Sequence, residues 1–128
     1  MSVALFFITH EGIASSLITI GEAIIQKANN NLSFYEVAMD ADIHSVAESI
    51  EDKLAQLDTQ EGLLIITDIY GSTPSNIAQK IADKHLAGLI SGVNLPMVIR
   101  LLNYRTEAIK PLIQKTLDGG IQGIQHKT

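Results

Sequence analysis

The chain has 128 residues, of which 46% are hydrophobic and 18% are charged, and its formal net charge at pH 7 is −5. This length suits one domain with a single sizeable core, and the composition excludes a disordered chain. Because the sequence contains no cysteine, disulfides, thiolate metal sites and cysteine nucleophiles are excluded. The acidic balance and the scattered basic residues argue against binding to nucleic acid. No apolar stretch approaches the roughly 20 residues needed to span a bilayer, and no signal peptide is recognisable, so we expect a soluble, cytoplasmic protein.

The first half of the chain predicts two strand–helix pairs. Val3–Ile8 is a continuous apolar run, typical of a parallel strand buried on both faces, and it leads directly to His10. Apolar residues then recur at helical spacing over Ile13–Ala28, which predicts the first helix. Leu32–Val37 predicts a second short strand, and Ile43–Leu57 predicts a second amphipathic helix.

The second half repeats the alternation. Gly62–Thr67 predicts a third, buried strand that ends at Asp68. Pro74 suits the first turn of a helix that runs to about Lys84, and Ala87–Ser91 predicts a fourth strand. Strands alternating with helices at this spacing indicate right-handed βαβ units and an α/β three-layer sandwich with a mostly parallel sheet. We expect a single domain over residues 1–128.

The C-terminal region is expected to differ from the rest. Helical segments are predicted to about Leu117, after which Gly119 and Gly120 predict a break in the chain. Ile121–Gln125 is then a candidate edge strand. Because this segment is too short to form an edge alone, and the glycines give it freedom to reach a neighbouring subunit, we expect a homodimer.

Two polar residues follow the first and third predicted strands. In an open α/β sheet, ligands bind beyond the carboxyl ends of the strands, where the strand order reverses. If the order is 2-1-3-4, His10 and Asp68 lie at neighbouring strand tips at that point. A carboxylate that accepts a hydrogen bond from one imidazole nitrogen fixes the tautomer and leaves the other nitrogen free as a nucleophile.

The loop after Asp68 supplies further groups. Gly71 allows close approach of the backbone, Ser72 and Thr73 offer hydroxyls, and the helix that begins near Pro74 directs its first N–H groups at an anion. Together these residues predict a phosphate-binding loop.

The remaining candidates carry no predicted chemistry. A structural or solvated role is favoured for three other histidines, no residue spacing indicates a metal site, and no cofactor is expected. The serines lack the turn that presents the nucleophile of a serine hydrolase. These residues are His44, His85 and His126, and Ser15, Ser16 and Ser91.

Four segments carry a resemblance over essentially the whole chain. They are the opening strand that ends in Thr9-His10, the segment Ile66-Thr-Asp-Ile-Tyr-Gly-Ser-Thr-Pro-Ser-Asn76, the segment Gly92-Val-Asn-Leu-Pro-Met97, and Gly119-Gly-Ile-Gln-Gly123. In these segments the sequence resembles the enzyme IIA proteins of the mannose family of the bacterial phosphoenolpyruvate-dependent sugar phosphotransferase system.

The resemblance implies a fold and a set of roles. The fold would be four parallel strands in the order 2-1-3-4, with a fifth, antiparallel edge strand exchanged between the subunits of a homodimer. His10 would be phosphorylated by HPr, the histidine-containing phosphocarrier protein, and would pass the phosphoryl group to a IIB protein. Membrane IIC and IID proteins would be reached only indirectly. Asp68 would orient the histidine, Thr73 would contact the phosphoryl group, and Gly71 and Ser72 would form the tight loop.

The sequence departs from the family pattern in two ways. Glu11 stands where relatives commonly have glycine, and we expect its carboxylate to be exposed, since a strand-to-helix tip usually faces water. We also expect no fused IIB domain, which leaves open a stand-alone regulatory module controlled by phosphorylation. A third interpretation is the phosphoryl-donor subunit of dihydroxyacetone kinase, although the segments at Asp68 and Gly92 fit the mannose branch better.

Overall fold

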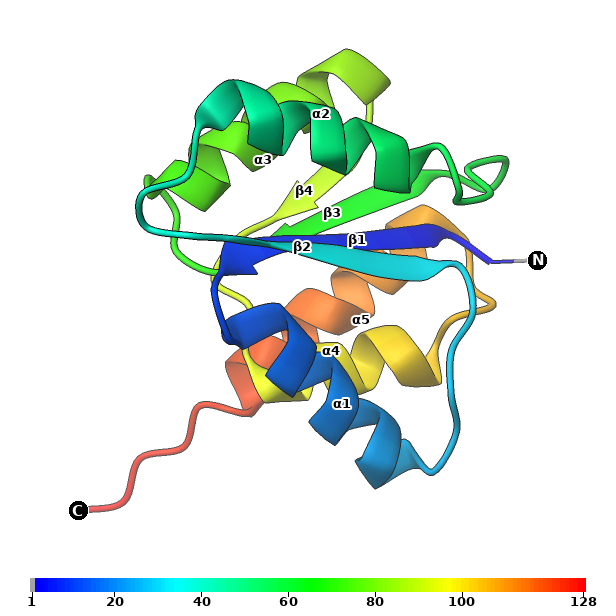
Figure 1. Ribbon diagram of the computed structural model, residues 1–128. Helices are drawn as coiled ribbons and strands as arrows, with labels where there is room; N and C mark the ends of the chain where they lie inside the picture. The colour runs from blue at the N-terminus through cyan, green and yellow to red at the C-terminus, as the bar shows by residue number, and fades with distance from the viewer. Residues whose placement is uncertain (1) are drawn as a thin grey trace.

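The protein is described by a computed structural model covering residues 2–128. Strands and helices alternate along most of the chain, as the sequence predicts, and the last two elements are both helices (Figure 1). The elements are β1 (Ala4–His10), α1 (Ile13–Ile25), β2 (Leu32–Val37), α2 (Ile43–Leu54), β3 (Leu63–Thr67), α3 (Thr73–His85), β4 (Gly88–Ile90), α4 (Leu95–Asn103) and α5 (Ile109–Gln122).

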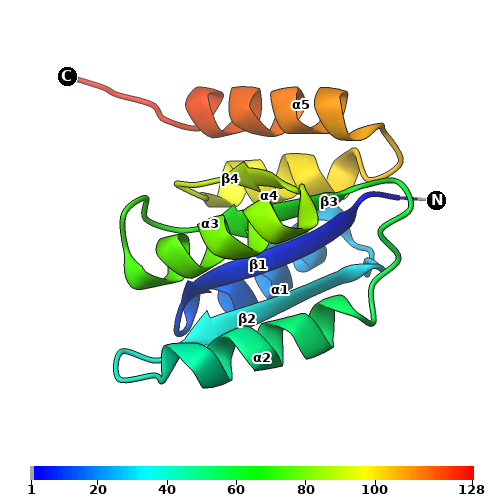
Figure 2. The ribbon, with the colours of Figure 1, turned by 90° about the horizontal axis from the view of Figure 1, so that it is seen from above.

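The four strands form one parallel sheet in the order β2-β1-β3-β4 (Figure 2). In the register of β1 and β3, Ile8 pairs with Thr67, so the residues that follow lie side by side at the carboxyl edge. The predicted order is therefore confirmed. The strand order reverses between β2, β1 and β3, which puts the switch point at the tips of β1 and β3.

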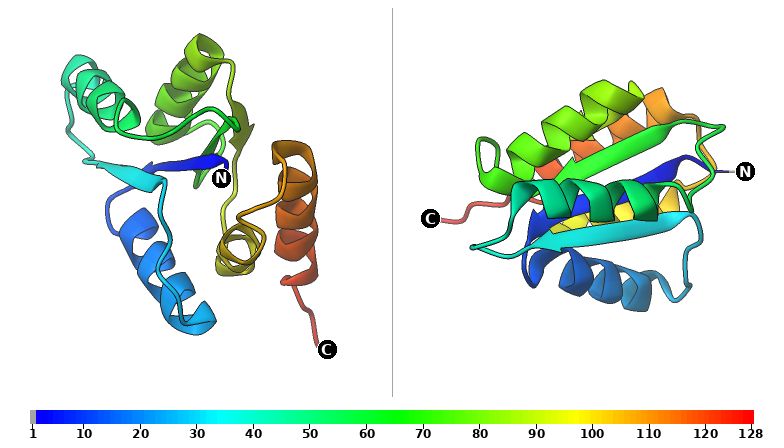
Figure 3. Two further views of the ribbon diagram at one scale, coloured as in Figure 1. Left: turned by 90° about the vertical axis from the view of Figure 1, so that its right-hand side faces the viewer. Right: turned by 45° about the horizontal axis from the view of Figure 1, so that its top comes forward.

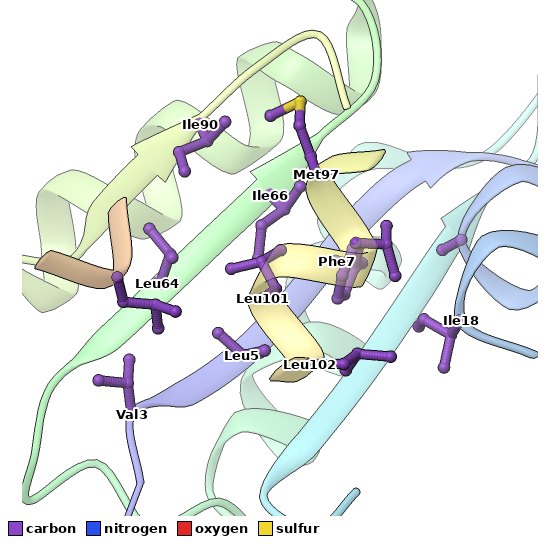
Figure 4. Packing of buried hydrophobic residues seen from close by; sticks show 13 residues of the cluster. Val3, Leu5, Phe7, Ile18, Leu64, Ile66, Ile90, Met97, Leu101 and Leu102 are labelled. Atoms are coloured by element: carbon purple, nitrogen blue, oxygen red, sulfur yellow. The ribbon is translucent and has the colours of Figure 1, made fainter. Parts of the chain in front are cut away.

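Helices cover both faces of the sheet, α2 and α3 on one and α1, α4 and α5 on the other (Figure 3). A hydrophobic core lies on each face of the sheet, and alternate residues of each strand contribute to one core or the other. Phe7 packs beneath α1 and α4, while Phe6 packs beneath α2 and α3. Figure 4 shows the first of these cores, in which Leu5, Ile66 and Leu101 meet. Burial on both faces explains why the strands are apolar without alternation. Truncating either phenylalanine to alanine would cost about 3–5 kcal/mol.

The predicted break in the C-terminal region is wrong. Gly119 and Gly120 do not break the chain, because both lie inside α5, where they are buried against α4. A Cβ on Gly119 would lie 2.4 Å from Cγ of Arg100, and one on Gly120 would lie 2.6 Å from Cγ of Met97. The two glycines therefore allow two helices to pack closely.

The predicted strand at Ile121–Gln125 is also absent from residues 2–128. Ile121 and Gln122 complete α5, and the chain then runs away from the body without regular structure (Figure 1). Strand exchange between subunits remains a prediction. Within the described part of the chain, no helix is long and apolar enough to cross a membrane.

Candidate active site

His10 and Asp68 are in direct contact at the carboxyl edge of the sheet. Nδ1 of His10 lies 2.8 Å from Oδ2 of Asp68, and the backbone N–H of His10 donates to the same oxygen at 2.9 Å. Because an ionised carboxylate can only accept, the proton of the neutral imidazole lies on Nδ1. Nε2 is then the nitrogen with a free lone pair, and it has no hydrogen-bond partner among the described residues.

Asp68 is fixed on every side. Its Oδ1 accepts the backbone N–H of Ile69 at 2.9 Å, and its carbonyl oxygen accepts the N–H of Gly92 at 2.7 Å. The side chain is 9% exposed, compared with 30% for His10. Burial by itself would raise the pKa of Asp68, but the hydrogen bonds from His10 and Ile69 and the nearby imidazole outweigh it and lower the pKa below its ordinary value. Asp68 is therefore a carboxylate at neutral pH.

The turn after β1 is held by Thr9. Its buried hydroxyl donates to the carbonyl oxygen of His10 at 2.8 Å and accepts the N–H of Ala14 at 3.1 Å, which ties the end of the strand to the first turn of α1. Gly12 occupies the turn with a φ of 85°, a conformation that favours glycine. Glu11 is exposed, as expected.

A carboxylate from β2 occupies the N-terminus of α1. Gly12 is the N-cap residue and has no side chain with which to cap the helix, and Oε2 of Glu36 accepts instead from the N–H and the hydroxyl of Ser15 at 2.8 and 2.7 Å. Burial favours a raised pKa for Glu36, but these bonds, a bond from Gly12 and the charge of Lys53 lower it. The carboxylate of Glu36 thus disfavours an anion at the N-terminus of α1.

The loop between β3 and α3 is internally braced. The hydroxyl of Ser72 donates to the carbonyl oxygen of Ile69 at 2.6 Å and accepts the N–H of Ser75 at 3.4 Å, while the hydroxyl of Ser75 accepts the N–H of Gly71 at 3.3 Å. Gly71 has a φ of 85°. Thr73 begins α3 and is exposed, and neither its N–H nor its hydroxyl has a partner among the described residues. The N–H and hydroxyl of Thr73 are therefore free to bind a ligand.

The other histidines lie away from this edge or in solvent. Nε2 of His85 contacts Oε1 of Glu51 at 2.7 Å, between α3 and α2, and His44 and His126 are exposed. The residues His10 and Asp68 are brought together as predicted, and Gly71, Ser72 and Thr73 lie on the loop that follows Asp68.

Sequence reasoning missed the supports of the site. Thr9, Glu36, Ser75 and Gly92 each fix part of it through one hydrogen bond or more. The lack of a capping side chain at Gly12 could have signalled that a cap comes from elsewhere, although nothing in the sequence indicates that Glu36 supplies it.

Comparisons with known proteins give the family of the chain. A family model described as EIIA-man, PTS system fructose IIA component, matches residues 4–117. The chain is 27% identical over 128 residues to the PTS system mannose-specific EIIAB component of Escherichia coli K12, an alignment that covers 98% of this chain and 39% of that protein. It is 30% identical over 86 residues to the fructose-specific EIIA component of Bacillus subtilis 168, covering 66% of this chain and 59% of that one.

The fold also matches a solved structure. The mannose/sorbose specific IIA subunit of Enterococcus faecalis superposes with a TM-score of 0.86 at 16% identity, over 100% of this chain and 96% of that one. At this identity the likeness shows the fold. The chain belongs to the EIIA-man family and spans about two fifths of the length of the mannose-specific relatives it matches.

Proposed function

We propose that the protein is a phosphocarrier of the sugar phosphotransferase system that accepts a phosphoryl group on Nε2 of His10 from HPr and passes it to a IIB protein. The observation that carries this proposal is the 2.8 Å contact between Nδ1 of His10 and Oδ2 of Asp68. It leaves one ring nitrogen as a partly exposed nucleophile at the switch point of the sheet.

The transfer balances without water or a cofactor. Nε2 of His10 attacks the phosphorus as the donor's P–N bond breaks, and the lone pair of that bond stays on the donor. The ring gains positive character while Nδ1 keeps its proton, and the carboxylate of Asp68 stabilises that character. The second transfer, to the IIB protein, reverses these steps.

Thr73 is proposed to hold the transferred group. Its N–H and hydroxyl are unengaged at the N-terminus of α3, where the helix dipole favours an anion. Ser72 and Gly71 keep the loop in shape through their own hydrogen bonds. The carboxylate of Glu36 disfavours an anion at the N-terminus of α1, which is consistent with binding at α3 instead.

Exposed apolar side chains support two proposed contacts with other chains. Ile69 and Tyr70, on the loop after Asp68, are 62% and 80% exposed and are placed to meet phosphoryl donors and acceptors. Ile121 and Ile124, at the C-terminal end, are 69% and 73% exposed and support a homodimer. This role requires the cytoplasm, where phosphoenolpyruvate is available.

The test is a reconstituted transfer. The protein is incubated with phosphoenolpyruvate, enzyme I and HPr, and its intact mass is measured together with that of His10→Ala and of a matched control, His44→Ala, which changes an exposed histidine. Wild type and His44→Ala should each gain one acid-labile phosphoryl group, and His10→Ala should gain none. Label that persists in His10→Ala would overturn the proposal.

A further inference from the structure

The connection between β4 and α4 (residues 91–94) holds the main chain of Asp68. It leaves the edge of the sheet and runs to the helical layer that contains α4 and α5 (Figure 1). The N–H of Gly92 donates to the carbonyl oxygen of Asp68 at 2.7 Å, and the N–H of Val93 donates to that of Thr67 at 3.2 Å. Two hydrogen bonds therefore attach this connection to the end of β3, beside the candidate active site.

Side-chain packing supports only part of this connection. Val93 packs against the hydrophobic core, but a cavity of about 190 Å³ lies between the connection and the end of α5. Gly92 and Asn94 line the cavity from the connection, and Gly120 lines it from α5. A Cβ on Gly92 would have no atom within 4 Å among the described residues beyond its chain neighbours. Hydrogen bonds therefore hold the connection where side-chain packing does not.

Asn94 joins the two walls of that cavity through its side-chain amide. Its Oδ1 accepts the N–H of Met97 at 3.0 Å, which caps the first turn of α4. Its Nδ2 donates to the carbonyl oxygen of Gly120 at 3.2 Å. That carbonyl lies in the last turn of α5, where helical carbonyls lack a partner within the helix. One side chain thus caps the start of α4 and the end of α5.

The bond to Gly120 goes beyond what a helix cap requires. Serine and aspartate cap a helix N-terminus about as well as asparagine does. Serine is too short to cap α4 and also reach Gly120, and ionised aspartate has no donor, whereas the amide carries an acceptor and a donor. The second bond therefore gives Asn94 a further effect, which is to tie the connection that carries Gly92 to α5.

We propose that Asn94 is a positioning residue for phosphoryl transfer and that it acts on His10 through Gly92 and Asp68. By tying the connection to α5, Asn94 keeps the N–H of Gly92 within bonding distance of the Asp68 carbonyl oxygen. Asp68 in turn fixes the proton of His10 on Nδ1 and the direction of Nε2. The inference rests on the proposed phosphocarrier function and adds to it a residue that acts through others.

The test compares two variants, Asn94→Ser and Asn94→Asp, with wild type. Both keep an acceptor for the N–H of Met97 and lose the bond to Gly120, so both should fold. The matched control is Asn103→Ser, which changes an exposed asparagine at the other end of α4. The control should match wild type in every measurement.

Three measurements follow the effect from the connection to the chemistry. Amide hydrogen exchange of Gly92 reports its bond to Asp68 directly, and we expect it to be at least about 5-fold faster in both variants. ¹⁵N NMR of the unphosphorylated protein, at a pH that leaves the ring of His10 neutral, should show protonation on Nδ1 in wild type and a mixture of tautomers in the variants. Rapid-quench transfer from phosphorylated HPr should be about 5-fold slower in the variants at saturating HPr, with the half-saturating HPr concentration unchanged.

A merely structural role would lower the free energy of unfolding in urea without changing these measurements in the folded protein. Wild-type exchange at Gly92, or wild-type transfer, in both variants would therefore overturn the proposal. Faster exchange with an unchanged His10 ring would overturn it as well. If the wild-type protein accepts no phosphoryl group, the phosphocarrier function fails instead, and the exchange and ring measurements still decide whether Asn94 orients His10.

Discussion

Replacing Asp68 with asparagine keeps the shape of the site but removes its charge and one acceptor. The carboxylate accepts two bonds from His10 on Oδ2 and one from the N–H of Ile69 on Oδ1. An amide has one oxygen and one NH2 group, so it cannot accept on both sides. If its oxygen faces Ile69, the NH2 group faces Nδ1 of His10 and forces the proton onto Nε2, which blocks the nucleophile.

Either orientation of the asparagine carries a cost. The loss of one hydrogen bond to a charged acceptor amounts to about 1.5–3 kcal/mol, a change that the fold tolerates. The transfer step loses the orientation of the ring, its tautomer and the stabilisation of its positive character. Together these losses should slow transfer by at least about 10²-fold.

Rapid-quench measurement of transfer from phosphorylated HPr checks this value. The matched control is Asp52→Asn, which removes a charge from the exposed side of α2. It should transfer at the wild-type rate. A folded Asp68→Asn protein that also transferred at the wild-type rate would refute the proposed role of the contact between Asp68 and His10 in phosphoryl transfer.

Four further outcomes follow from the structure. Because the pKa of Asp68 lies below its ordinary value in the folded chain, its contribution to stability is fully present above about pH 4 and is lost as the pH falls through the folded pKa. When the free energy of unfolding is measured at successively lower pH, the difference between wild type and Asp68→Asn should therefore become smaller. Thr73→Ala should slow transfer less than about 10-fold in the same rapid-quench assay, since the backbone N–H at the start of α3 remains. Gly120→Ala should lower the free energy of unfolding by about 1–3 kcal/mol in urea, because its Cβ would lie 2.6 Å from Cγ of Met97, and an unchanged midpoint would contradict this packing. Sedimentation velocity at micromolar concentration should show a homodimer that Ile121→Glu converts to monomer, whereas a monomeric wild type would count against the proposed assembly.

The strands could be predicted because buried strands are recognisable as apolar runs, whereas the strand order was implied by the family resemblance. Val3–Ile8 and Leu63–Ile66 are apolar throughout, which is typical of strands in a parallel sheet that is covered on both faces. With the order 2-1-3-4, His10 and Asp68 are expected at neighbouring strand tips, and the structure shows them in contact there.

The C-terminal region could not be predicted by the same logic. Glycine in a helix lowers helical propensity by up to about 1 kcal/mol, so Gly119 and Gly120 indicate a break when they are considered alone. Their actual role depends on Arg100 and Met97 of α4, which lie some twenty residues earlier. Close packing of two helices is a tertiary effect, and local propensity does not encode it.

The supports of the active site escaped prediction for a related reason. Glu36 caps α1 from a different strand, and Gly92 holds Asp68 through its backbone. These contacts join segments that only the folded chain brings together. The reacting residues were identifiable from type and position, but the groups that orient them were not.

The position of phosphorus on the imidazole of His10 tests the central claim most directly. Phosphorylated protein with ¹⁵N-labelled histidine is examined by long-range ¹H–¹⁵N NMR, which distinguishes the two ring nitrogens. The geometry predicts phosphorus on Nε2, with a proton retained on Nδ1 in contact with Asp68. Phosphorus on Nδ1 of His10, or on any of His44, His85 and His126, would contradict it.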